Sequence, residues 1–142
     1  MTPTITMTDK QDAADIQMLV RELIQFNEQH GGPRNAPSLL LFVSDPETQE
    51  AFGGLYGATV YDRLKIELIY LPETLRGKGL RRELVRKAEE EAVRRGCRGV
   101  LLETFDFQAR GFYERLGYEV YGTVENFPPG HNLFSMQKKL GA

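Results

Sequence analysis

The stretch Leu75-Arg76-Gly77-Lys78-Gly79-Leu80-Arg81-Arg82 lies between two segments of different hydrophobic periodicity. Before it, residues 64–71 alternate as in a β-strand, so that Ile66, Leu68 and Tyr70 would share one face and Glu67, Ile69 and Leu71 the other. After it, apolar residues recur every fourth position, as on one stripe of a helix: Leu80, Leu84, Ala88 and Ala92. Residues 99–105 then read as a buried strand. The sequence therefore predicts a strand–turn–helix–strand unit, with Pro72 ending its first strand.

The turn has the chemistry of an anion site. The first amides of a helix have no backbone partner, and the helix dipole adds positive charge there, so helix N-termini attract phosphate. Gly77 and Gly79 would let the backbone close around an anion without hindrance from Cβ atoms. Positions 76–87 hold six basic side chains and one acidic side chain. The alternative is a basic turn followed by a solvated helix face, and the strand–turn–helix context favours phosphate binding.

The remaining elements extend this unit into a larger sheet. A capping box at Thr8-x-x-Gln11 predicts a helix whose apolar stripe is Ile16, Leu19, Val20, Leu23 and Ile24 and which ends near Gly31-Gly32-Pro33. Further strands are expected at 38–44, 51–61, 118–124 and 132–139, with a tight turn at Asp62-Arg63. Gly96 is expected to cap the long helix, and a short helix is expected at 108–116. The resulting order α–β–β–β–α–β–α–β–β predicts an α/β fold around one mixed sheet.

Composition narrows the protein class. The chain has 142 residues, 41% of them hydrophobic and 27% charged, which predicts one globular domain spanning 1–142. One cysteine excludes an intramolecular disulfide, and with two histidines it excludes a Cys/His zinc cluster, so no metal is expected. No apolar run approaches the ~20 residues that cross a bilayer. The first residues lack the features of a secretion signal, so a cytoplasmic protein without membrane contacts is expected.

The turn also resembles motif A of the GNAT superfamily of acyl-CoA-dependent N-acyltransferases, whose pattern is Arg/Gln-x-x-Gly-x-Gly/Ala. The six positions are occupied here by Arg76 to Arg81, with Arg81 in place of the usual small residue. A second family pattern, Asn-x-x-Ala-x-x-x-Tyr followed by a Gly-aromatic pair, is matched by Asp106, Ala109, Tyr113 and Gly117-Tyr118, with Asp106 replacing Asn. The resemblance is strong from about 64 to 121 and weak before residue 50.

This resemblance implies a GNAT-like fold, with a mostly antiparallel sheet of six or seven strands flanked by three or four helices. It implies acetyl-CoA as co-substrate, with the pyrophosphate held by the backbone amides of the turn. The coenzyme contacts expected from it are Tyr70, Leu71, Arg76, Gly77, Lys78, Gly79, Leu80, Arg81, Asp106, Ala109 and Phe112. A backbone amide of the Tyr70-Leu71 segment would polarise the thioester carbonyl, where the family splays this strand from the next one.

Two residues are candidates for proton transfer during acetylation of an amine. Tyr113, with an ordinary pKa near ~10, can protonate a leaving thiolate of pKa near ~8.5, a role the family gives to this tyrosine. The alternative is that Tyr113 only packs beside the apolar stripe. Glu67 is the expected general base, acting directly or through water, and the alternative is a solvated glutamate at a strand edge.

Several other residues are weaker candidates for the functional site. Cys97 is expected to be a small buried apolar residue rather than a nucleophile. His131, in the Pro-Pro-Gly-His turn, is either an acceptor contact or alternative base, or only decorates the turn. Glu103 and Asp106 either line the acceptor pocket or cap the helix beginning near Gln108. By family analogy, the loop 31–37 would wall the acceptor site.

Three functions follow in order of support. The first is an acetyl-CoA-dependent N-acetyltransferase acting on a primary amine of a small molecule or peptide, and the second is a non-catalytic acyl-CoA sensor. Nucleic-acid binding ranks last, because the basic helix has no interleaved aromatic residues and no nucleic-acid partner is expected. Since family members are often homodimers, a homodimer is one expected assembly.

Charge is distributed unevenly along the chain. Residues 73–98 hold nine basic and five acidic side chains, and the rest of the chain holds nine basic and 15 acidic side chains. The positive field thus coincides with the expected pyrophosphate site.

Overall fold

The computed structural model describes residues 1–141 and divides the chain into two units, Met1–Arg34 and Asn35–Ala142. The first unit holds one long helix, and the second holds the sheet with two further helices. The prediction of one domain spanning 1–142 stays a prediction. In the described residues, no helix has the length and apolarity that crossing a membrane requires.

Helix α1 (Ala13–Gly31) begins later than the sequence predicted. Its N-cap is Asp12, whose carboxylate accepts the Ala14 amide at 2.9 Å, whereas the Thr8 hydroxyl only accepts the Lys10 amide. The predicted capping box is therefore wrong, because Asp12 lies directly before the amphipathic segment and is a strong capping residue in its own right. The predicted end is confirmed at Gly32, which has φ of 86° and donates to the Glu28 carbonyl.

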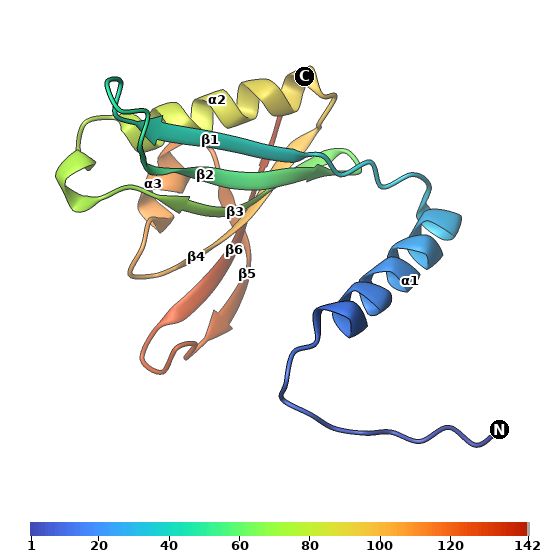
Figure 1. The fold of residues 1–142 in the computed structure, drawn as a ribbon. Helices are drawn as coiled ribbons and strands as arrows, with labels where there is room; N and C mark the ends of the chain where they lie inside the picture. Colours follow the sequence, from blue (N-terminus) through green and yellow to red (C-terminus); the bar gives the residue numbers. More distant parts are fainter. Residues whose placement is uncertain (142) are drawn as a thin grey trace. The chain divides into compact units, whose positions relative to one another are not determined.

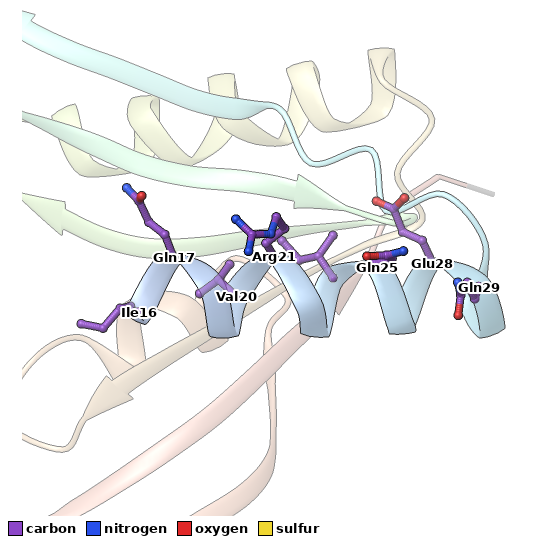
Figure 2. Close-up of a pocket in the computed structure, with 8 residues that line it drawn as sticks. Ile16, Gln17, Val20, Arg21, Gln25, Glu28 and Gln29 are labelled. Atoms are coloured by element: carbon purple, nitrogen blue, oxygen red, sulfur yellow. The ribbon is translucent and has the colours of Figure 1, made fainter. Parts of the chain in front are cut away.

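The predicted apolar stripe of α1 is present but unburied in its own unit. No residue of α1 is buried, since a lone helix has no second element to pack against. Figure 2 shows Ile16 and Val20 on this stripe, rimmed by polar side chains from Gln17 to Gln29.

The second unit is built on a six-stranded sheet in the order β1-β2-β3-β4-β6-β5 (Figure 1). The strands are β1 (Ser38–Ser44), β2 (Ala51–Val60), β3 (Arg63–Tyr70), β4 (Gly99–Phe105), β5 (Glu119–Glu125) and β6 (Asn132–Lys139). Only β3 and β4 pair in parallel, joined by the crossover helix α2 (Leu80–Arg94). A mixed, mostly antiparallel sheet and three α-helices, the third being α3 (Arg110–Arg115), confirm the predicted fold class.

The core of this unit joins one face of the sheet to α2 and α3. The predicted α2 stripe is confirmed, with Leu84, Ala88 and Ala92 buried, and the adjacent Val85 joins them. Buried sheet residues such as Leu64, Val100 and Met136 belong to the same apolar cluster. Gly96, with φ of 85°, lies in the left-handed conformation directly after the helix, as predicted.

The face pattern predicted for β3 is wrong after Ile66. The register with β2 pairs Tyr56 with Leu68 and Gly57 with Ile66, so Glu67 is the extra residue of a β-bulge. Leu64 and Ile66 are buried before the bulge, and Leu71 is buried after it, while Leu68 and Tyr70 are exposed. The bulge shifts the alternation by one residue, which the apolar pattern alone did not reveal.

Gly57 makes this bulge possible, because a Cβ there would lie 2.5 Å from the Lys65 carbonyl oxygen. The β2–β3 turn is also one residue earlier than predicted. It contains Tyr61 and Asp62, with Tyr61 at φ of 52°.

Candidate active site

Strands β3 and β4 separate part-way along their length, and this opening forms the centre of the site. Their parallel pairing ends at Lys65 and Leu101, although β3 continues to Tyr70 and β4 to Phe105. A cavity of about 340 Å³ lies where they diverge, between residues 66–71, at and just beyond the end of β3, and residues 102–104 of β4. We call it the splay cavity. The bulge at Glu67 begins where the pairing ends, so it lies at the point of divergence.

The glycine-rich turn borders a second cavity of about 590 Å³, which we call the turn cavity. Gly77 and Gly79 have φ of 76° and 80°, so both positions favour glycine through backbone conformation, whereas a Cβ at either would meet no atom within 4 Å. The first amide to close a backbone bond in α2 is that of Glu83, which donates to the Gly79 carbonyl at 3.0 Å. The amides of Leu75 and Arg76 donate to the carbonyls of Pro72 and Glu73, so the amides available to an anion are those of residues 77–82.

The two cavities share a boundary. Five residues line both of them: Leu71, Arg76, Arg81, Gln108 and Ala109. Arg76 donates through Nε to the Leu71 carbonyl at 3.1 Å, and the Arg81 guanidinium lies over the Phe112 ring at 5.8 Å. Two cationic side chains are thus held where the cavities meet, which suits a long ligand with anionic groups at the turn and its reactive end in the splay.

Tyr113 projects from α3 into the splay cavity and is 7% exposed. Burial raises the pKa of its hydroxyl above the ordinary value of 10.0, and the positive charge of Arg81 acts in the opposite direction. The hydroxyl therefore keeps its proton at all pH values near neutrality and is available as a donor. The neighbouring Tyr118 ring lies edge-on at 5.5 Å. Tyr118 donates to Glu89 at 2.7 Å, so the two tyrosines differ in their hydroxyl environments.

The splay cavity also has carboxylates on both of its sides. Glu67 lies on β3 at the bulge, and Glu103 lies on β4, where its Oε2 accepts a 3.5 Å hydrogen bond from the Ser135 hydroxyl. In residues 1–141 no three metal-ligating side chains of His, Cys, Asp or Glu come together.

Asp106 takes a different position from its predicted companions. It lines neither cavity, and its two carboxylate oxygens lie 2.8 Å from Nδ1 of His131 and from the amide of Asn132, which donates to it. Partial desolvation acts to raise the pKa of Asp106, but hydrogen bonds from Asn132, His131 and the Phe107 amide, with the charge of His131, lower it overall. Asp106 does not cap α3 either, because the N-cap there is Ala109, without a side-chain bond.

Comparison with known proteins identifies the family of the chain. Residues 9–118 match the model of the acetyltransferase (GNAT) family. The chain belongs to the GNAT family. It is an acetyl-CoA-dependent acetyltransferase, and its resemblance to the family is confirmed.

Two curated acetyltransferases are similar in sequence. Blasticidin-S acetyltransferase of Streptomyces morookaense is 38% identical over 95 residues, covering 66% of this chain and 70% of that protein. Acetyltransferase Atu2258 of Agrobacterium fabrum is 29% identical over 134 residues, covering 94% of this chain and 97% of that protein.

Solved structures share the fold. A proposed acetyltransferase from Agrobacterium tumefaciens superposes with a TM-score of 0.92 at 28% identity, over 97% of this chain and 100% of that one. An acetyltransferase from Bacillus cereus gives a TM-score of 0.82 at 29% identity, over 95% and 98%.

Most of the predicted site residues come together around the two cavities. Three of them line the splay cavity but not the turn cavity: Glu67, Tyr70 and Tyr113. Four others line both cavities: Leu71, Arg76, Arg81 and Ala109. Gly77, Gly79, Leu80 and Phe112 line the turn cavity. Lys78 and Asp106 line neither. Cys97 is buried, as predicted, and burial raises the pKa of its thiol, which opposes a nucleophilic role.

The two cavities also include residues that the sequence analysis did not assign to the site. Arg115 lines the turn cavity, Phe107 lines the splay cavity and Gln108 lines both. Arg82, a cation of the predicted anion-binding turn, lines the turn cavity as well. Arg115 could have been found from helical spacing, because it follows the predicted contact Phe112 by three positions on α3. Phe107 gave no such signal, since its position depends on how the chain leaves β4.

Proposed function

We propose that this enzyme transfers the acetyl group of acetyl-CoA to a primary amine of a small molecule or peptide by direct attack. The observation that carries the proposal is that four side chains line one opening between β3 and β4: Glu67, Arg76, Arg81 and Tyr113. The pyrophosphate would bind the amides of the glycine-rich turn, with Arg76, Arg81 and Arg82 neutralising its charge. The acyl-bearing arm would then enter the splay cavity.

The proposed reaction has one bond-forming and one bond-breaking event. The neutral amine nitrogen attacks the thioester carbonyl carbon, and the C–S bond breaks to release coenzyme A as a thiolate. The Tyr113 hydroxyl gives its proton to that sulfur, and Glu67, directly or through water, takes the proton that the amine loses. A free amide on the β4-facing edge of the Tyr70-Leu71 segment would hold the carbonyl oxygen as it becomes negative.

The placement of Glu67 supports its role as base. As the extra residue of a bulge it is unpaired with β2, and it lines the splay cavity where the strands diverge. Bulges of this kind re-aim single side chains beside active sites. A glutamate in the regular ladder would instead follow the alternation of its strand.

Two observations favour a small cationic amine as the acceptor. The similar Streptomyces morookaense protein is named for acetylation of blasticidin-S. Glu67 and Glu103 give the splay cavity an acidic character that suits a cationic amine. We therefore propose small cationic amines as the first acceptors to test.

The test is release of coenzyme A thiol from acetyl-CoA in the presence of a panel of amines. The proposal expects acceptor-dependent thiol release and an acetylated amine by mass spectrometry. Glu67→Gln should lower kcat and alter the acidic limb of the pH–rate profile, while leaving the affinity for acetyl-CoA within about twofold. A profile unchanged in Glu67→Gln would remove this residue as the base, and absence of acceptor-dependent release across the panel would contradict the proposed reaction.

A further inference from the structure

An aromatic cluster lies at one end of β4, beside the splay cavity. It consists of Phe105, Phe107, Phe127 and His131, which we call the aromatic corner. The Phe105 and Phe107 rings are parallel within 5° at 5.2 Å, and the His131 ring lies edge-on to Phe107 at 4.9 Å. Phe127 lies 6.0 Å from Phe105. Phe107 and Phe127 are nevertheless 57% and 51% exposed, so these rings are not core residues.

Hydrogen bonds hold the aromatic corner in place. The Asp106 carboxylate bridges His131 and the amide of Asn132, each at 2.8 Å. The Asp106 amide donates to the Asn132 carbonyl at 2.9 Å, and the Phe127 amide donates to the His131 carbonyl at 2.8 Å. The end of β4 and the β5–β6 turn are thereby joined, and the exposed rings project from a fixed frame. This also gives Asp106 a role that does not require contact with coenzyme A.

The aromatic corner is continuous with the site of chemistry. Phe107 lines the splay cavity together with Glu67, Glu103, Tyr70 and Tyr113. A ligand group entering there meets a flat apolar ring and two carboxylates. Exposed aromatic residues beside a polar cavity are a feature of ligand sites, because removing such rings from water is favourable when a second flat surface covers them.

We infer that the aromatic corner is an acceptor subsite that binds a planar ring joined by a short chain to the primary amine that is acetylated. The ring would stack on Phe107 while the ammonium group lies toward Glu67 and Glu103 before it loses its proton. This inference rests on the proposed function, and it adds to it the class of amine.

The experiment compares 2-phenylethylamine with n-butylamine, which has the same amine and no ring. Binding of each to the protein saturated with coenzyme A is measured by calorimetry, and acetylation is measured separately by thiol release. We expect 2-phenylethylamine to bind about tenfold tighter than n-butylamine. Phe107→Leu, which keeps an apolar side chain but removes the flat ring, should reduce that preference to about twofold or less.

The matched control is Phe52→Leu, which changes another exposed phenylalanine of the same sheet, outside the splay cavity. It should leave the preference unchanged, and both variants should keep the affinity for coenzyme A within about twofold, which shows that they fold. Equal binding of the two amines by the unaltered protein, or a preference that survives in Phe107→Leu, would overturn the inference. Ring-selective binding without turnover of any amine would support the subsite and contradict the proposed reaction.

Discussion

The two ends of helix α2 carry basic side chains at similar density but in different surroundings. Around its N-terminus, Lys78, Arg81 and Arg82 form no ion pair with any residue of the described chain. From the second turn onward, the cations are paired: Arg86 with Glu83 and Glu90, and Arg94 and Arg95 with Glu91. Charge that a protein leaves unpaired beside free helix amides is available to a ligand, whereas paired charge contributes to the fold.

Arg95 has a structural role at the C-terminal end of α2. Its guanidinium donates to the carbonyls of Pro37 and Ser38, to the Thr59 hydroxyl and to Glu91. It therefore fixes the end of α2 to the start of β1 and to β2. Cations in the last turn of a helix interact favourably with its dipole, but the structure shows that Arg95 also connects three elements.

The largest expected effect concerns Tyr113, which lines the splay cavity, compared with its buried neighbour Tyr118. Tyr113→Phe should lower kcat by about 100-fold or more with little change in KM for acetyl-CoA, because it removes only the proposed proton donor. Tyr118→Phe is the matched control. Its hydroxyl donates to Glu89, which also accepts from Lys138 at 2.9 Å, so its loss should reduce stability and leave kcat within about threefold.

Steady-state kinetics with a saturating amine separates these outcomes. Equal loss of kcat in both variants would show that packing rather than proton transfer is the role of Tyr113. Because burial raises the pKa of Tyr113, the proton donor should persist through pH 9, and no loss of kcat below that pH should depend on this residue.

A smaller effect is expected at the C-terminal end of α2. Arg95→Ala should lower the free energy of unfolding by about 2 kcal/mol, since it leaves two carbonyls and a hydroxyl without their charged donor. Arg94→Ala, which removes only an exposed pair with Glu91, should cost about 0.5 kcal/mol or less. Urea denaturation measures both, and similar losses in the two variants would contradict the anchoring role of Arg95.

The smallest expected effect is on the pH dependence of stability, and it arises at Glu91 near the C-terminal end of α2. Hydrogen bonds from Arg94 and then Arg95 lower the pKa of Glu91 from 4.5 to about 2. A carboxylate with a depressed pKa in the folded state stabilises the protein above the unfolded pKa, and that contribution is lost as the pH falls from about 5 toward 2. Thermal unfolding between those pH values should therefore depend less on pH in Glu91→Gln than in the unaltered protein. Parallel curves would show that Glu91 contributes nothing to acid sensitivity.

Much of the fold was predictable because local patterns and tertiary structure agree. The periodicity of α2, Gly96 after it and the extent of β4 from Gly99 to Phe105 were all read directly from the sequence. The bulge at Glu67 was not predictable from alternation. Its apolar neighbours Leu68 and Tyr70 suit either face, and only the close approach that Gly57 allows selects the observed register.

The candidate site, like the fold, was predictable only where a local sequence pattern carries the information. The turn glycines and Tyr113 lie in recognisable motifs, and the structure places them on two adjoining cavities, while their roles stay a prediction. Asp106 occupies a motif position, but its carboxylate is bound by His131 and Asn132, which are distant in sequence. Spacing along a chain cannot show such a partner, and the aromatic corner was missed for the same reason.

The most direct test of the central claim, that unpaired cations at the start of α2 bind the co-substrate, is the dissociation constant of coenzyme A for two matched variants. Arg82→Gln and Arg86→Gln each remove one exposed positive charge from α2, one turn apart, but Arg82 borders the turn cavity and Arg86 is paired with Glu83 and Glu90. Calorimetry should give about fivefold weaker binding for Arg82→Gln, as expected for one lost charge-assisted contact, and a change within about twofold for Arg86→Gln. Equal weakening in both variants, or none in Arg82→Gln, would contradict the account.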